Sequence, residues 1–77
     1  MIQDADAEVD ATGLRCPMPL LKAKRALNAM QPGEILRVLS TDSGSVRDFT
    51  VFSEQSGHAL LSSAQQGDVY TLLLRKA

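Results

Sequence analysis

The chain of 77 residues has little cysteine, few aromatic residues and almost no net charge. With one cysteine and one histidine it can form no internal disulfide and cannot supply the usual ligand set of a structural zinc site. No apolar run is long enough to cross a bilayer, and the acidic start MIQDADAEVD lacks the basic and apolar parts of a signal peptide. We therefore expect a cytoplasmic protein with no membrane segment, no metal and no cofactor.

The charges nearly cancel, because eight basic residues and nine acidic residues leave a formal net charge of -1. Proteins that bind nucleic acid through its phosphates usually carry a surplus of lysine and arginine. The balance therefore argues against direct nucleic-acid binding as the main function, although it leaves room for a local basic patch. With 44% hydrophobic residues and no low-complexity tract, the composition is that of a single globular domain spanning residues 1–77.

The order of apolar and polar residues predicts two helices and four strands. A turn at Thr12 and Gly13 ends the first strand, and Pro32 and Gly33 follow the first helix. Ser45 and Asp48 fit the capping box of a second helix. The predicted elements are a strand at 7–11, a helix at 17–30, an interior strand at 35–39, a helix from 45 to before Gly57, and strands at 58–63 and 69–75.

This order, βαβαββ, predicts an α/β (α+β) two-layer sandwich: a four-stranded mixed sheet with both helices on one face. If the first two strands are parallel, right-handed crossovers start both helices at the same edge of the sheet. Open α/β folds usually bind ligands at that edge. We therefore expect Cys16, just before the first helix, to lie near Asp42, Ser43 and Ser45, at the entrance to the second.

The stretch GLRCPMPL places Cys16 at the start of the first helix. Pro17 suits the first helical position, which makes Cys16 the predicted N-cap. Backbone N–H groups and the helix dipole then favour the thiolate and lower the pKa of the cysteine, with the N–H of Met18 and the cation of Arg15 nearest the sulfur. Pro19 removes a further donor from this turn.

Position alone leaves two interpretations of Cys16 open: a small buried hydrophobe, as most free cysteines are, or a reactive thiol. Without a second cysteine, a thioredoxin-like mechanism is excluded, so a reactive Cys16 would take up a group and pass it on. The alternative to an active cysteine is a regulatory module that binds RNA or protein, with Arg15, Lys22, Lys24 and Arg25 as RNA contacts. His58 stands alone, and we assign it no role.

The segment DATGLRCPMPLLKAKRAL, from Asp10 to Leu27, resembles the signature of the TusA family, also called SirA-like, in which D-x-x-G-x-x-C-P-x-P opens the first helix. The similarity extends into LSTDSGSVRDF and the LLRK ending. The resemblance implies a two-layer sandwich and a sulfur carrier, of sulfurtransferase type rather than a stand-alone enzyme. A cysteine desulfurase loads such a carrier with a persulfide, and a downstream acceptor protein receives the sulfur. The resemblance implies that Cys16 carries the persulfide. The other defined positions of the motif are occupied by Asp10, Gly13, Pro17 and Pro19.

Met18 departs from the glutamate that stands between the prolines in many members serving tRNA thiolation. The resemblance therefore leaves the acceptor open among tRNA thiolation, molybdenum enzyme maturation and other sulfur routes. We expect partners to dock at the Cys16 edge, where Arg15, Lys22 and Arg25 would meet an acidic rim. Two strands carry apolar residues on both faces, so some of these side chains must point away from the helices and form a contact surface. They are Ile35, Leu36, Val38 and Leu39 in one strand and Leu72, Leu73 and Leu74 in the other.

Overall fold

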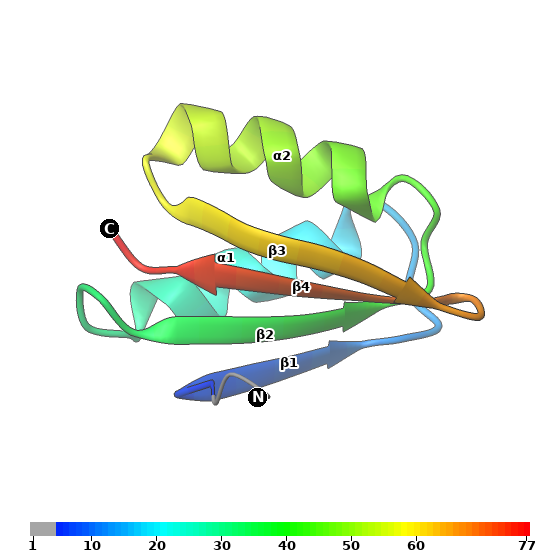
Figure 1. The fold of residues 1–77 in the computed structure, drawn as a ribbon, viewed down its shortest axis with the longest axis horizontal. Helices are drawn as coiled ribbons and strands as arrows, with labels where there is room; N and C mark the ends of the chain where they lie inside the picture. Colours follow the sequence, from blue (N-terminus) through cyan, green and yellow to red (C-terminus); the bar gives the residue numbers. More distant parts are fainter. Residues whose placement is uncertain (1–4) are drawn as a thin grey trace.

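The computed structural model describes residues 5–77, and residues 1–4, where the acidic start of the chain begins, lie outside the described residues. The described chain forms β1 (Ala7–Ala11), α1 (Met18–Asn28), β2 (Ile35–Ser40), α2 (Ser45–Ser56), β3 (Ala59–Gln66) and β4 (Val69–Arg75). This is the predicted order βαβαββ, shown in Figure 1.

The four strands form one mixed sheet in the order β1-β2-β4-β3. Strand β1 pairs in parallel with β2, whereas β4 runs antiparallel to both β2 and β3. The arrows of β1 and β2 point to the same end of the sheet, where the chain leaves toward α1 and α2 (Figure 1). The prediction that both helices start at one edge of the sheet is therefore confirmed.

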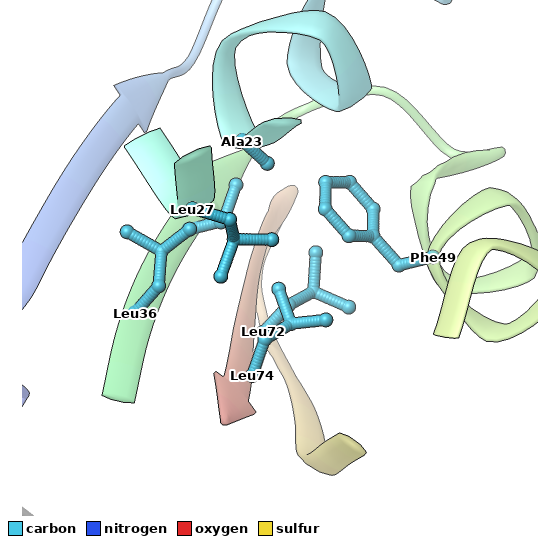
Figure 2. Packing of buried hydrophobic residues seen from close by; sticks show 7 residues of the cluster. Ala23, Leu27, Leu36, Phe49, Leu72 and Leu74 are labelled. Atoms are coloured by element: carbon cyan, nitrogen blue, oxygen red, sulfur yellow. The ribbon is translucent and has the colours of Figure 1, made fainter. Parts of the chain in front are cut away.

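The hydrophobic core lies between the helices and one face of the sheet. Helix α1 packs over β1 and β2, and α2 packs over β3 and β4. The core residues of β2 and β4 face each other in register, so their side chains share the face that the helices cover. Burial of each leucine or phenylalanine contributes about 1.5–3 kcal/mol. The buried cluster, most of it shown in Figure 2, consists of Ala23, Leu27, Leu36, Val38, Phe49, Leu72 and Leu74.

The opposite face of the sheet is apolar at its centre, as predicted from the two-sided pattern. Ile35, Leu39 and Leu73 alternate with buried residues of the same strands and are half-buried. Neither helix of the described chain covers them, because both helices pack on the other face. An ion pair at 3.2 Å between Arg37 Nη1 and Glu8 Oε1 joins β2 and β1 on this open face.

The second helix begins where it was predicted, but the prediction of a capping box formed by Ser45 and Asp48 is wrong. Gly44 occupies the N-cap position of α2, and no side chain caps the helix start. Ser45 turns inward instead, with its Oγ 2.6 Å from the Oγ of Ser40 in the core. The end of the helix is as predicted, because Gly57 adopts the left-handed conformation with φ 86°.

The hairpin at the end of the chain is tighter than predicted. Strand β3 continues to Gln66, so Gly67 and Asp68 alone connect it to β4. The pairing of β3 with β4 shifts by one residue between Leu60 and Ser62, which marks a β-bulge.

Candidate functional site

The loop before α1 is held by the aspartate and glycine of the D-x-x-G motif. The carboxylate of Asp10 accepts hydrogen bonds from the hydroxyl of Thr12 at 2.6 Å and from its backbone N–H at 3.0 Å. Both hydrogen bonds hold the pKa of Asp10 below its usual value, and the bond from the Thr12 hydroxyl has the larger effect. Gly13 has φ +81°, which favours glycine, and its N–H donates to Thr41 Oγ1 at 2.8 Å. The two residues therefore fix the loop that carries Cys16.

Helix α1 starts one residue later than predicted, which changes the position of Cys16. Pro17 occupies the N-cap position and Met18 is the first helical residue, so Cys16 lies one residue outside the helix. The Cys16–Pro17 peptide bond is cis. The N–H of Met18 donates to the carbonyl of Arg15 at 2.8 Å, and Pro17 and Pro19 have no N–H to offer. The predictions that Cys16 is the N-cap and that Met18 donates to the sulfur are wrong.

Cys16 is an exposed free cysteine. It therefore does not serve as a core residue, and packing does not account for its presence. Cys16 lines a groove of about 640 Å³ that lies between α1 and α2 and runs along α2 as far as Gln55. The groove combines an apolar part, two cations and two carboxylates, and it is lined, among others, by Leu20, Val51, Phe52, Lys24, Arg47, Asp42 and Asp48.

Two nearby carboxylates disfavour the anionic form of Cys16. A hydrogen bond with the carboxylate of Asp48 is the main cause that raises the pKa of the Cys16 thiol, followed by desolvation and by the charges of Asp48 and Asp42. The prediction that the helix start lowers this pKa is therefore wrong. The helix start offers little to a thiolate, since the Met18 N–H is engaged and two prolines lack this donor.

The two carboxylates of the groove lie over Gly44. A Cβ atom placed on this glycine would be 3.5 Å from Asp42 Oδ2 and 3.8 Å from Asp48 Oδ2. Within residues 5–77, no lysine or arginine lies in ion-pair contact with either carboxylate. The ammonium of Lys24 instead lies 5.5 Å from the ring centre of Phe52, in a cation–π contact.

Comparison with known proteins identifies the family. The family model described as sulfurtransferase TusA matches residues 7–76. This chain belongs to the TusA family.

Similar proteins cover the chain almost completely. The chain is 47% identical over 74 residues to the sulfur carrier protein TusA of Allochromatium vinosum, covering 96% of this chain and 97% of that protein. It is 49% identical over 67 residues to the putative sulfur carrier protein NMA0882 of Neisseria meningitidis serogroup A, covering 87% and 90%. The crystal structure of the SirA-like protein DSY4693 from Desulfitobacterium hafniense has the same fold, with a TM-score of 0.79 at 24% identity, covering 90% of this chain and 95% of that chain. The predicted family and fold are confirmed.

The residues predicted near the second helix of this TusA-family chain divide into two groups. Asp42 and Ser43 line the groove with Cys16, as predicted. Ser45 does not, because it is 1% exposed and bonded to Ser40 inside the core. Ser40 Oγ also accepts the N–H of Asp42 at 3.1 Å. Ser45 therefore supports the loop that carries Asp42 and does not face the groove.

Two of the three cations predicted to meet a partner lie together on α1, and the third, Arg15, precedes the helix. Lys22 and Arg25 line a small hollow of about 130 Å³ with the exposed side chains of Met18 and Leu21. Arg15 is exposed and does not line the groove. Lys24, which was predicted only as an RNA contact of the alternative regulatory module, is the lysine that lines the groove.

Asp48 and Arg47 of this TusA-family chain line the groove, although neither was predicted as a site residue. Asp48 was assigned to a capping box, because its position three residues after Ser45 fits that pattern. The signal was present in the topology, since parallel strands bring the first turn of α2 to the same edge as Cys16.

The described residues contain no group of three or more histidine, cysteine, aspartate or glutamate side chains that could hold a metal ion. Between residues 5 and 77, no helix is long and apolar enough to span a membrane.

Proposed function

We propose that this chain is a sulfur carrier in which Cys16 accepts a sulfane sulfur from a cysteine desulfurase and delivers it to an acceptor protein. The observation that carries the proposal is the exposure of Cys16, within its family motif, at the edge where both helices begin. An exposed thiol can enter the active site of a donor or an acceptor. Relatives named as sulfur carriers, similar along nearly their whole length, support the same role.

The transfer is an exchange between a persulfide and a thiol. The sulfur of Cys16 attacks the sulfane sulfur of the donor persulfide, and a new S–S bond forms as the S–S bond of the donor breaks. The donor cysteine leaves as a thiolate and receives the proton that the Cys16 thiol has lost. No net oxidation occurs, so the step needs neither a second cysteine nor a cofactor on this chain. The acceptor cysteine takes the sulfur from Cys16 by the same exchange.

Partner docking is proposed around Cys16. Met18 is 43% exposed and Leu21 is 47% exposed, so the outer side of α1 offers apolar contact beside the cations Lys22 and Arg25. With Arg15, these cations suit a partner surface that has an apolar centre and an acidic rim. The exposed Met18, in place of a glutamate, gives the acceptor an uncharged contact two residues after Cys16.

The proposed acceptor belongs to a sulfur-relay route, such as tRNA thiolation, molybdenum enzyme maturation or a related sulfur pathway. The proposed compartment is the cytoplasm, where free thiols stay reduced and a carrier cysteine remains available. The balanced charge of the chain argues against direct binding of nucleic acid, so a route to tRNA would pass through an acceptor protein.

The test is loading of the purified chain by a cysteine desulfurase with pyridoxal phosphate and free cysteine. Intact mass spectrometry should show the gain of one sulfur atom on the wild-type protein and its loss after a reductant is added. Cys16→Ser should gain no sulfur, because it lacks the thiol. A wild-type protein that takes up no sulfur, or a Cys16→Ser variant that loads equally well, would reject the carrier function.

A further inference from the structure

Resting on the proposed function, we propose that Asp48, assisted by Asp42, is a positioning residue that distinguishes the unloaded from the loaded carrier. The carboxylate of Asp48 holds the protonated thiol of Cys16 in the groove. Once the sulfur is loaded, the same two carboxylates repel the persulfide anion and turn it out of the groove toward the acceptor.

The geometry of the groove supports the first half of this proposal. Cys16 lines the same groove as Asp48, which comes from the first turn of the facing helix α2, so the carboxylate of Asp48 is placed to accept a hydrogen bond from the thiol. The carboxylate of Asp42 lies over the same glycine, Gly44, and adds a second negative charge at this place. A protonated thiol can donate to a carboxylate, whereas a thiolate cannot. The groove therefore fits the thiol and disfavours its anion.

The cations around the groove do not cancel this effect. Lys24 and Arg47 line the groove, and Arg15 precedes the cysteine, but none is in ion-pair contact with Asp42 or Asp48. The ammonium of Lys24 faces an aromatic ring. The pKa of Cys16 is accordingly raised and not lowered, which agrees with the dominance of the carboxylates.

Loading reverses the interaction between the sulfur and the carboxylates. A persulfide S–S–H group is more acidic than a thiol, so at neutral pH it releases its proton to solvent and becomes an anion. The anion has no proton to donate to Asp48, and like charges at close range repel. The terminal sulfur therefore leaves the groove when it is ready for transfer. The unloaded thiol, by contrast, stays protonated and reacts slowly with electrophiles.

One reagent tests both states. Alkylation of Cys16 by iodoacetamide is followed by intact mass spectrometry over a pH series, on the unloaded protein and on the protein loaded by a desulfurase. In the unloaded state, Asp48→Asn should move the midpoint of alkylation to lower pH and raise the rate at neutral pH at least about twofold, because removing the carboxylate favours the thiolate. In the loaded state, the same variant should react at least about twofold more slowly, because the asparagine amide donates to the persulfide anion and retains it.

The opposite signs separate a positioning role from a structural one. A disturbed helix start would change both rates in the same direction. Asp42→Asn, which removes a charge without the hydrogen bond, should give smaller shifts of the same signs and provides a second variant if Asp48→Asn folds poorly. Glu54→Gln is the matched control: it removes the same charge from an exposed position on α2 outside the groove and should leave both rates unchanged.

The outcomes distinguish the inference from the function on which it rests. If wild type takes up no sulfur, the carrier function fails and the inference fails with it. If wild type loads but both aspartate variants behave like wild type, or change both rates in the same direction, the inference alone is overturned.

Discussion

Ser40 and Ser45 join the end of β2 to the start of α2 inside the core. Their exposed fractions are 0% and 1%, and their Oγ atoms lie 2.6 Å apart. The Oγ of Ser40 also accepts the backbone N–H of Asp42. Replacing one serine by alanine therefore leaves the hydroxyl of the other without its partner in the core. Replacing both removes the stranded hydroxyl as well.

The expected losses follow from these contacts. A buried polar group left unpaired costs about 1–3 kcal/mol. Ser45→Ala strands the hydroxyl of Ser40 and should lower the free energy of unfolding by about 1–2 kcal/mol. Ser40→Ala strands the hydroxyl of Ser45 and the N–H of Asp42, so about 2–3 kcal/mol is expected. The double variant leaves only the N–H of Asp42 unpaired, so it should cost about 1–2 kcal/mol, less than Ser40→Ala alone, which gives a coupling energy of about 2–3 kcal/mol.

Urea unfolding followed by circular dichroism measures these differences. For a domain of this size the slope is about 1 kcal/mol per molar urea, so a loss of 1 kcal/mol moves the midpoint by about 1 M. Ser62→Ala, at an exposed position of β3, should stay within about 0.5 kcal/mol of wild type. Additive losses in the double variant, or a Ser45→Ala variant as stable as the control, would refute the argument that the two hydroxyls depend on each other.

Two further predictions concern charge and pH. Charge reversal by Arg15→Glu with Lys22→Glu should slow loading from the desulfurase, most strongly at low salt, in a protein that unfolds like wild type. An unchanged loading rate would place the docking surface elsewhere. Burial, and then the charge of Lys76, lower the pKa of His58, whose Nδ1 accepts the N–H of Ala77 at 3.0 Å. Protonation therefore favours the unfolded chain, and the melting temperature should fall as the pH drops below about 6.5. In the His58→Gln variant the melting temperature should depend less on pH. A variant whose melting temperature falls with pH as steeply as that of wild type would contradict this prediction.

The fold was predictable because burial leaves a local period in the sequence. In β1 the alternation of Ala7 and Val9 with Glu8 shows which face is covered, and the nearly continuous apolar run of β2 around Arg37 shows a strand with neighbours on both sides. The glycine after α2 needs only its own φ to end the helix. Each of these signals lies within a few residues of the structure it predicts, so no distant contact has to be known.

The chemistry of the site was not predictable in the same way. Pro17 has a fixed φ that suits either the N-cap or the first helical position, and the choice between them moves Cys16 by one residue along the helix start. The pKa of Cys16 then depends on Asp48, which lies far along the chain and reaches the thiol through the pairing of β1 with β2. A serine at a helix start such as Ser45 has the same local pattern whether its hydroxyl caps the helix or faces the core.

The two outer strands of the sheet discourage the addition of a foreign strand by different means. Strand β1 carries the acidic side chains of Glu8 and Asp10 along its edge. Strand β3 has eight residues and no charged side chain, so it would be an open template for aggregation if it were straight. The bulge between Leu60 and Ser62 bends it, and a strand that paired with its outer edge would lose register there. Substitutions that straighten this bulge should therefore reduce solubility before they reduce the stability of the folded chain.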